Sequence, residues 1–364
     1  MNYHFSGEEE TDSPSLIYYK DIIEENIKKI INIAGGAQRL WPHVKSHKTT
    51  GFIRMQIESG INRFKCATIA EAEICALSGA EHALLAYPLV GPAIERFPEL
   101  VKKYIKTDFW ASGDDIRQLE LLGKTAAAAN INSVKTLIDV NMGMNRTGVL
   151  PELLEEFYRK AVRIDGLDIK GFHCYDGHLG IKNFDERQKA VISSADKFFE
   201  VKKSLEKQGY EIPVIVMGGT PTFPCHVKTP DVFLSPGTIF IQDNGYSLKY
   251  PDLDFTPGAA ILSRVISHPA KGLFTLDTGN KAIAADPAIR GVIADLPDAK
   301  PLFQSEEHWV WSLEETPPPI GTVLYIIPTH ICPSSALYQS ILVIKNGKRS
   351  EIWEVDARNR RINV

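Results

Sequence analysis

The sequence predicts an α/β fold in two parts, a TIM-like (β/α)8 barrel followed by a mostly antiparallel β domain. From Leu16 to about residue 245, short apolar runs alternate with segments of helical period, which is typical of parallel βα units. After Tyr250 the helical period is lost, and strand-like runs follow one another. A length of 364 residues allows a large barrel and a smaller module.

The first part contains a series of predicted strands and helices. Strands are predicted at residues 16–19, 40–45, 63–67, 82–87, 106–111, 136–140, 169–175, 214–217, 231–234 and 238–241. Helices are predicted at residues 21–33, 49–58 and 69–78, and from Pro92, Asp114, Pro151 and Asp185 onward. About eight βα units can close into a barrel, which removes the unpaired edges of a long parallel sheet. An open doubly wound sheet is the alternative.

The second part is predicted to be a separate β domain. Its strands are expected at residues 259–267, 274–276, 308–313, 322–327, 340–344 and 351–355. We therefore divide the chain into an acidic N-terminal tail (1–15), a barrel that we expect to bind a cofactor for the reasons given below (16–250) and a C-terminal β domain (251–364). The tail carries three consecutive glutamates, and we expect it either to be mobile or to join the β domain.

The composition favours a small-molecule substrate. A net charge of -4 and a pI near 6.2 give no long-range attraction to nucleic acid or to an acidic membrane surface. The N-terminal residues contain no apolar stretch that could enter a membrane. The five cysteines are odd in number and widely spread, which predicts reduced thiols and a cytoplasmic protein.

The segment from Trp41 to Thr49 is the first candidate for chemistry. It contains two histidines and two lysines directly after an apolar run, and we interpret it as a strand end that leads into a helix. In a βα barrel the active site forms at the carboxyl ends of the strands. A desolvated lysine such as Lys45 could act there as an amine nucleophile that forms a Schiff base with a carbonyl cofactor. A solvated surface lysine is the alternative interpretation.

Three further polar clusters follow predicted strands. They are Asp139–Gly148, His173–His178 and Gly218–Thr222. The first places Arg146 between glycines, and the second offers Tyr175 and His178 as phenol and imidazole groups. A structural arginine that pairs with Asp139 is the alternative for Arg146.

The glycine-rich cluster suits a phosphate group. Gly218 and Gly219 would let backbone N–H groups approach an anion closely, and Thr220 adds a hydroxyl donor. Gly237 and Thr238 follow one unit later, and barrels often bind phosphate with the loops after their last strands. A tight turn without a ligand is the alternative. Lysine, arginine and a phosphate cradle around one barrel mouth together predict pyridoxal phosphate.

The β domain contains a candidate metal pair, His330 and Cys332. On an extended chain these two side chains would point to one face, and imidazole plus thiolate favours zinc. Two protein ligands leave room for water or substrate, as in a catalytic metal site. A histidine and a cysteine in a packed core are the alternative.

Taken together, the motifs resemble those of the metal-activated pyridoxal phosphate enzymes of the D-threonine aldolase and D-serine dehydratase family, which share the alanine racemase type of barrel. The likeness extends over nearly the whole chain from Leu16. The segment from Pro42 to Lys48 resembles the cofactor-lysine motif, which implies that Lys45 forms the Schiff base. The segment from Gly143 to Gly148 resembles the one whose arginine contacts the phenolate oxygen of the cofactor, which is Arg146 here.

The resemblance implies a lyase that acts on β-hydroxy D-amino acids and works as a homodimer with a divalent metal, expected to be Zn2+. Cysteine at position 332 is similar to the dehydratase pattern, in which β-elimination gives an α-keto acid and ammonia. Asp176 departs from that pattern, which has histidine at this point. Retro-aldol cleavage to glycine and an aldehyde, with His178 as base, is the alternative. A racemase and a non-catalytic carrier of the cofactor are further alternatives.

Overall fold

The computed structural model describes residues 2–364 and divides into two compact units. Of the described residues, the barrel unit comprises 29–45, 50–237 and 359–364, and the sheet unit comprises 2–28, 46–49 and 238–358. The predicted boundary after residue 250 therefore differs from the observed division, because residues 238–250 cluster with the sheet unit.

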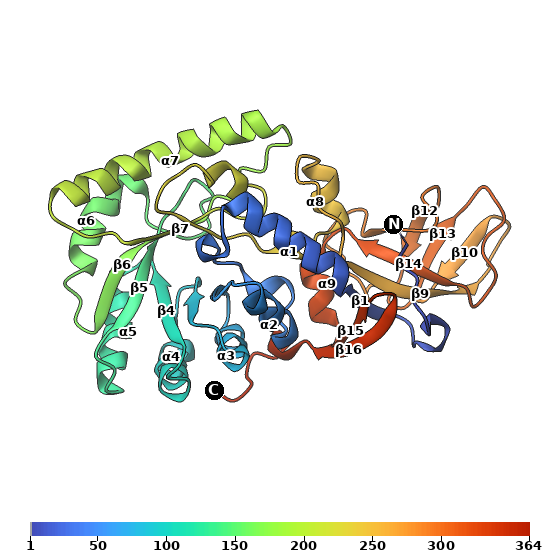
Figure 1. Ribbon diagram of the computed structural model, residues 1–364, viewed down its shortest axis with the longest axis horizontal. Helices are drawn as coiled ribbons and strands as arrows, with labels where there is room; N and C mark the ends of the chain where they lie inside the picture. Colours follow the sequence, from blue (N-terminus) through green and yellow to red (C-terminus); the bar gives the residue numbers. More distant parts are fainter. Residues whose placement is uncertain (1) are drawn as a thin grey trace. The chain divides into compact units, whose positions relative to one another are not determined.

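The barrel unit is built on seven parallel strands that lie in chain order (Figure 1). They are β2 (Arg63–Cys66), β3 (His82–Leu85), β4 (Asp108–Gly113), β5 (Val134–Asp139), β6 (Leu167–Cys174), β7 (Val214–Met217) and β8 (Phe233–Leu234). The register aligns Lys65 with Leu84, and Leu84 with Trp110. The prediction of a barrel of parallel βα units is confirmed.

Residues 40–43 close this sheet into a ring. Parallel bridges join Leu40 to Leu234 in β8 and His43 to Lys65 in β2. The N–H of Lys65 donates to the carbonyl of Pro42 at 2.7 Å. Proline has no N–H to donate, so this segment makes only isolated bridges where we predicted a full strand. An apolar cluster of Trp41, Leu84, Trp110, Leu137 and Val216 combines side chains from five positions around the ring.

Helices connect the barrel strands. They are α2 (Thr50–Glu58), α3 (Ile69–Ser78), α4 (Pro92–Lys103), α5 (Ile116–Ala128), α6 (Pro151–Ala161) and α7 (Phe184–Lys207). Helix α1 (Lys20–Ala34) instead follows β1 (Ser15–Tyr19), and its first nine residues belong to the sheet unit. Thr68, Asp115 and Asn183 cap α3, α5 and α7, each accepting a hydrogen bond from a backbone N–H in the first turn. Figure 1 shows α4, α5 and α6 around the outside of the neighbouring barrel strands.

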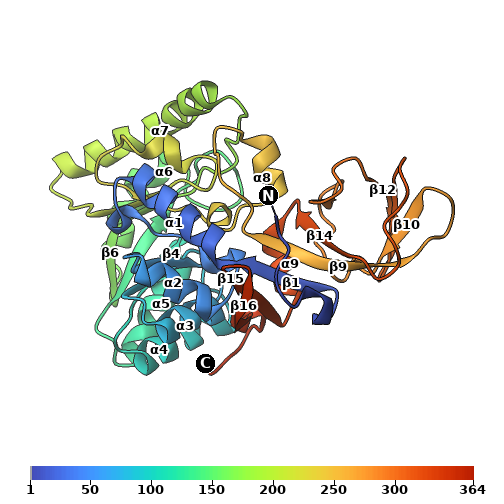
Figure 2. The ribbon, with the colours of Figure 1, turned by 45° about the vertical axis from the view of Figure 1, so that its right-hand side comes forward.

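The sheet unit contains nine strands, and most of its strand pairs are antiparallel, as predicted. They are β1 (Ser15–Tyr19), β9 (Ala259–Ser267), β10 (Leu273–Leu276), β11 (Gly291–Ile293), β12 (Lys300–Gln304), β13 (Trp309–Ser312), β14 (Val323–Pro328), β15 (Ser340–Lys345) and β16 (Lys348–Glu354). Figure 2 shows β9 extending from beside β1 to β10.

Strand β1 corrects one prediction. We expected residues 16–19 to open the barrel, but β1 pairs in parallel with β15 and antiparallel with β9. An alternating apolar pattern indicates that a segment is a strand, but it does not indicate which sheet the strand joins. The pairing of β1 with β15 joins residues that are more than three hundred positions apart in the sequence. The strand is buried on both faces.

The N-terminal segment is packed onto the sheet unit. Tyr3 and Phe5 are buried in an apolar cluster that includes Ile17 and Tyr325. Arg264 donates hydrogen bonds to the backbone carbonyls of residues 8, 9 and 11. In this structure the segment packs on the sheet unit, where two buried aromatic side chains outweigh the acidic run as anchors.

Several short elements were not predicted correctly. Residues 238–240 form a 3₁₀ helix where we predicted a strand, and helix α8 (Asn244–Lys249) follows, with Asp243 as its N-cap. Helix α9 (Ile331–Leu337) begins directly after His330. Strands β11 and β12 were missed because they are short and partly exposed. These elements have too few residues to show a clear period.

Candidate active site

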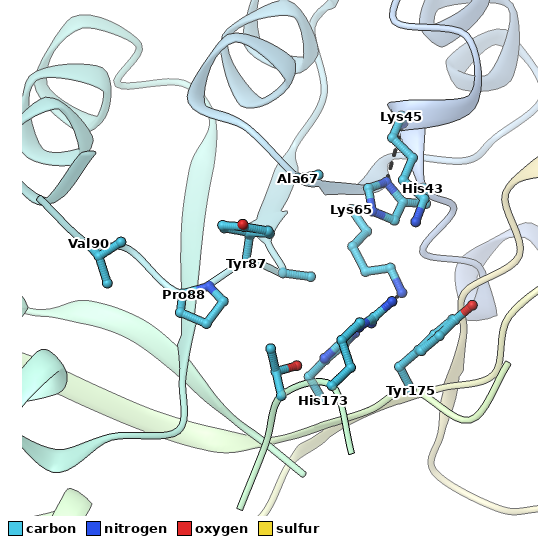
Figure 3. Close-up of a pocket in the computed structure, with 12 residues that line it drawn as sticks. His43, Lys45, Lys65, Ala67, Tyr87, Pro88, Val90, His173 and Tyr175 are labelled. Carbon is cyan, nitrogen blue, oxygen red and sulfur yellow. Dashed lines mark hydrogen bonds between the residues drawn. The ribbon is translucent and has the colours of Figure 1, made fainter. Parts of the chain in front are cut away.

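A cavity of about 530 Å³ lies in the barrel unit (Figure 3). Its lining includes residues that follow several barrel strands, as expected for the mouth of a βα barrel. The polar or aromatic lining residues are His43, Lys45, Lys65, Tyr87, Arg146, Thr147, His173 and Tyr175. The lining carries three basic side chains with no carboxylate among them, so the cavity suits anionic ligands.

Lys45 lies in the cavity lining, as predicted. It belongs to a short 3₁₀ helix, residues 44–46, which follows the closing segment of the barrel. The backbone N–H of Lys45 donates to Nδ1 of His43 at 3.3 Å. This hydrogen bond joins the backbone of Lys45 to a neighbouring imidazole that also lines the cavity.

A network of buried polar side chains includes Lys65, which lines the cavity. Its Nζ lies 3.3 Å from Nε2 of His173, and Nδ1 of His173 lies 2.7 Å from Oδ1 of Asp139. The other carboxylate oxygen of Asp139 accepts a hydrogen bond from the hydroxyl of Thr147 at 2.7 Å. Figure 3 shows the amine end of Lys65 directed toward His173 and Tyr175.

The surroundings of this network set its protonation. Burial and the nearby Lys45 lower the pKa of Lys65 to about 7, although Asp139 acts in the opposite direction. Burial and Lys65 lower the pKa of His173. Burial favours a higher pKa for Asp139, but the hydrogen bonds from His173 and Thr147 outweigh it and lower the pKa. The arrangement therefore holds an anionic carboxylate, a neutral imidazole and an amine that titrates near neutral pH.

Arg146 and Tyr175 meet at the cavity. The guanidinium of Arg146 lies 4.7 Å from the centre of the Tyr175 ring, and Nζ of Lys65 lies 5.5 Å from the same ring. Two cations near one aromatic face hold that ring by cation–π attraction. The structure thus brings the predicted Lys45, Arg146 and Tyr175 together in one cavity lining.

The candidate phosphate loop follows β7. Gly218 has φ +78°, and a Cβ on Gly219 would lie 2.9 Å from Cε2 of Tyr175, so both positions favour glycine. The N–H of Gly237 donates to the hydroxyl of Thr220 at 3.3 Å, which joins the two predicted loops. The hydroxyl of Ser235 is buried and has no hydrogen-bond partner among the described residues. Glycine backbone and an unpaired hydroxyl fit a phosphate group.

A second network, of buried hydrogen bonds, stabilises this loop. The hydroxyl of Thr222 donates to Oδ1 of Asp176 at 2.6 Å, and Nε2 of His226 lies 2.6 Å from Oδ2 of the same residue. The N–H of Gly219 donates to the Thr222 hydroxyl at 2.9 Å. Asp176 therefore fixes the loop conformation, and the departure from the dehydratase pattern at this position has a structural role.

His178 lies apart from the cavity lining. Its side chain is exposed, and its Nε2 is near the backbone of Gly143, in the loop after β5. The segment from Asn141 to Asn145 is tied together by hydrogen bonds to the Asn141 side chain. A role for His178 as base remains a prediction.

The candidate metal pair lies in the sheet unit. We predicted that His330 and Cys332 share an extended strand, and this was wrong, because β14 ends at Pro328 and Cys332 lies in the first turn of α9. Pro333 suits that first turn, where its missing N–H costs no hydrogen bond. The hydrogen bond to Cys332, together with that to Asp286, raises the pKa of His330 to about 9.

Two further side chains contact the pair. Oδ2 of Asp286 lies 2.6 Å from Nδ1 of His330, and the hydroxyl of Thr238 lies 3.1 Å from Sγ of Cys332. Thr238, which we predicted to bind the cofactor, is thus placed beside the metal pair. Across residues 2–364 we found no group of three or more histidine, cysteine or acidic residues that could hold a metal. The donors fit a site with two protein ligands and open positions.

Sequence reasoning missed Lys65 and Ser235 as site residues. The sequence did contain one signal for Lys65: this lysine lies between Phe64 and Cys66 in a short predicted strand. A parallel sheet is expected to be covered on its outer face, so a lysine within such a strand is unusual. Ser235 lies in the predicted loop of residues 235–238 but was not chosen as a binding residue. Only the structure shows that its hydroxyl is buried without a hydrogen-bond partner among the described residues.

Comparison with protein families gives a match to the alanine racemase N-terminal domain over residues 20–241. The chain belongs to this family. A second model, for a serine dehydratase domain, matches residues 258–344.

Two curated relatives of this family member are aldolases. D-threonine aldolase of Arthrobacter sp. is 25% identical over 359 residues, covering 95% of this chain and 93% of the relative. The 3-hydroxy-D-aspartate aldolase of Paracoccus denitrificans (strain Pd 1222) is also 25% identical, over 374 residues, covering 97% and 94%.

Solved structures of the family show the same architecture. D-threonine aldolase from Filomicrobium marinum superimposes with a TM-score of 0.90 at 26% identity, covering 96% of each chain. D-threo-3-hydroxyaspartate dehydratase from Delftia sp. HT23 gives a TM-score of 0.81 at 20% identity, covering 95% of this chain and 98% of the other. A cysteine-to-alanine variant of a dehydratase of that name has been solved in a metal-free form.

The family member described here is a pyridoxal-phosphate-dependent lyase. None of its described helices combines the length and the apolar character needed to cross a membrane.

Proposed function

We propose that this lyase acts on β-hydroxy D-amino acids by β-elimination, which gives an α-keto acid and ammonia. The observation that carries the proposal is the pair His330 and Cys332, because an imidazole beside a thiolate matches the dehydratase pattern of the family. The metal-free dehydratase variant that lacks a cysteine supports a link between cysteine and metal in such enzymes. Imidazole and thiolate together favour zinc.

The residues of the cavity then have distinct roles. Lys45 would hold the cofactor through its amine and, once displaced by the substrate, take up the Cα proton at Nζ. Arg146 would donate to the ring oxygen of the cofactor, while Tyr175 lies beside it in the lining. Pyridoxal phosphate supplies the electron sink when it is bound.

The remaining binding roles belong to two loops and the metal pair. Gly218, Gly219 and Thr220, with Gly237 from the next loop, would surround the phosphate. The Thr220 hydroxyl would donate to it, because the N–H groups of Gly219 and Gly237 already donate to Thr222 and Thr220. His330 and Cys332 would hold a zinc ion, whose contribution is Lewis acidity toward a hydroxyl group.

Retro-aldol cleavage to glycine and an aldehyde is the second candidate. It is favoured by the two aldolases of about the same length at 25% identity. Racemisation would need no metal, so the pair His330 and Cys332 counts against it. A non-catalytic carrier of the cofactor would need no second unit, so the sheet unit counts against a carrier.

Product analysis decides between these reactions. The purified protein, supplied with pyridoxal phosphate and zinc, is incubated with D-serine, D-threonine and 3-hydroxy-D-aspartate, with the L-isomers as controls. We expect pyruvate or 2-oxobutyrate with equimolar ammonia from D-serine or D-threonine. Glycine with an aldehyde would establish cleavage instead, and absence of product from every D-isomer would overturn the proposed function.

We also propose that the chain works as a homodimer in the cytoplasm. The homodimer follows from the family resemblance, and the compartment from its cysteines. The structure has all five as thiols, and four of them are buried.

A further inference from the structure

The proposed reaction needs a second acid/base group in the cavity. Lys45 would carry the Cα proton, but both elimination and cleavage also move a proton at the β-hydroxyl. His178 is exposed and lies outside the cavity lining. Lys65 is buried at the base of the cavity, and the register of β2 places it level with Leu84, whose side chain points into the barrel core.

Lys65 lies at the end of the buried network and lines the cavity together with His173 and Thr147. Asp139 engages Nδ1 of His173 at 2.7 Å, so the proton sits on Nδ1 and Nε2 is left as an acceptor for Lys65 at 3.3 Å. Both ring nitrogens of His173 are thus occupied by protein groups. An amine has further hydrogens or a lone pair, which Lys65 can direct to a ligand.

We propose that Lys65 is a catalytic residue that exchanges a proton with the β-hydroxyl of the substrate, while Asp139 and His173 act as positioning residues. This inference rests on the proposed lyase function. In elimination, the Lys65 ammonium gives its proton to the departing hydroxyl, which leaves as water, and Lys45 holds the Cα proton. In cleavage, neutral Lys65 takes the hydroxyl proton as the Cα–Cβ bond breaks and the carbonyl of the aldehyde forms. The bonding electrons remain on Cα, and one proton returns there to give glycine.

The charges around Lys65 support this role. The groups that face it are Lys45, Arg146, His43, His173, Tyr175, Asp139 and Asp176. Lys45 and Arg146 favour the neutral amine of Lys65. The carboxylates of Asp139 and Asp176 favour its ammonium form. The amine can therefore hold or release a proton close to neutral pH, where proton transfer is most efficient.

Labelling of the apoprotein tests this state without any turnover. The full chain is treated briefly with acetic anhydride at a series of pH values, and modification of each lysine is read by mass spectrometry. We expect the labelling of Lys65 to be half-maximal near pH 7, against about pH 10 for exposed lysines. Lys45→Met should move the Lys65 midpoint to higher pH, and Asp139→Asn should move it to lower pH. A midpoint near pH 10 in the wild-type protein would overturn the inference, even if both variants failed to fold.

Kinetics of the holoenzyme test the catalytic role. In Lys65→Met, the visible absorbance of the lysine-linked cofactor and the exchange of the Cα proton with D2O should persist, because both depend on Lys45. Turnover should fall about 10²- to 10⁴-fold with little change in KM. Lys65→Arg should not restore it, because a guanidinium does not titrate near neutral pH.

Three outcomes would contradict the role of Lys65 specifically. They are unchanged turnover in Lys65→Met, loss of Cα exchange together with turnover, and a raised KM confined to 3-hydroxy-D-aspartate, which would make Lys65 a binding site for a second carboxylate. An inactive wild-type enzyme would instead refute the proposed function, and the labelling result would still test Lys65.

Discussion

Two lysines share one cavity, and their surroundings differ. Lys45 lies at the closing point of the barrel with His43 beside it, whereas Lys65 is supported by His173 and Asp139. Amines close to one another favour loss of a proton, which suits a nucleophile. The cavity therefore offers two chemically distinct amines, and the assignment of the cofactor to one of them can be measured.

We predict that the cofactor is linked to Lys45. Borohydride reduction of the holoenzyme should fix the cofactor on the peptide that contains Lys45, and Lys45→Ala should abolish the visible absorbance of the linked cofactor. Lys65→Met should retain it. Recovery of the reduced cofactor on Lys65 would reverse the roles given to the two amines.

The buried Lys65 should destabilise the apoprotein at low pH. Its pKa falls from 10.5 to about 7 on folding, so the folded chain binds fewer protons than the unfolded chain between these values. The destabilisation of the folded protein by Lys65 has its full size below about pH 7, and it decreases as the pH rises toward 10. Lys65→Met should therefore raise the free energy of unfolding at pH 6, by up to about 4 kcal/mol, and this gain should vanish near pH 10.

Urea denaturation of the cofactor-free protein at pH 6 and pH 10 measures this difference. Lys102→Met in α4, where the side chain is exposed, is the matched control and should change little at either pH. A gain in Lys65→Met that does not depend on pH would show that Lys65 titrates alike in both states.

We predict that substitutions at the metal pair and at its neighbour Asp286 reduce zinc binding to different extents. Cys332→Ala should lose bound zinc and turnover, because it removes one of two protein ligands. Asp286→Asn should keep the fold and weaken zinc binding about 10- to 100-fold, since the carboxylate orients His330 at 2.6 Å. Competition with a chromophoric chelator measures both affinities, and Glu315→Gln, an exposed carboxylate of the same unit, is the control. Full activity after complete chelation would exclude a catalytic metal.

At the scale of the elements, the loops after β7 and β8 form one candidate binding surface. Ser235 contributes a buried hydroxyl that has no hydrogen-bond partner within residues 2–364. Ser235→Ala should therefore weaken binding of pyridoxal phosphate about 10-fold, a hydrogen bond to a charged group being worth roughly 1.5 kcal/mol or more. The apoprotein should keep its stability, because no internal hydrogen bond is lost.

Equilibrium titration of the apoprotein with the cofactor, and thermal unfolding without it, measure these two effects. Ser78→Ala in α3 is the control, because its hydroxyl donates to the carbonyl of Ile74 and lies away from the cavity. Unchanged cofactor affinity in Ser235→Ala would assign the phosphate to other donors.

The elements also show what the sequence could predict. Strands with clear apolar runs, such as β9 and β14, were found nearly to the residue, because burial and period agree there. The partner of β1 was not predictable from local pattern, since its neighbours lie at the other end of the chain. Helix α9 was missed because it has only seven residues and its N-cap residue, His330, makes no capping hydrogen bond with its side chain.

The candidate site was predictable to a similar extent. The motifs that contain Lys45, Arg146 and Tyr175 pointed to the cavity, because barrel topology gathers the positions that follow its strands. Lys65 was not identified, because its importance comes from His173 and Asp139, which lie on other strands. Motifs within one loop are visible in sequence, whereas contacts across strands are not.

At the scale of the whole molecule, we predict a homodimer. Light scattering of the purified protein should give twice the chain mass of 40.5 kDa, and the mass should not change over a tenfold dilution. A monomer that is fully active at all concentrations would contradict this assignment.

The position of β1 has a consequence for synthesis of the chain. Its final partners, β9 and β15, begin at Ala259 and Ser340, so the first strand made by the ribosome must wait for the last third of the chain. The barrel strands, by contrast, each pair with the next strand to emerge. Folding during translation can therefore complete the barrel while the sheet unit is still open, and release of the C-terminus sets the moment at which both units are finished.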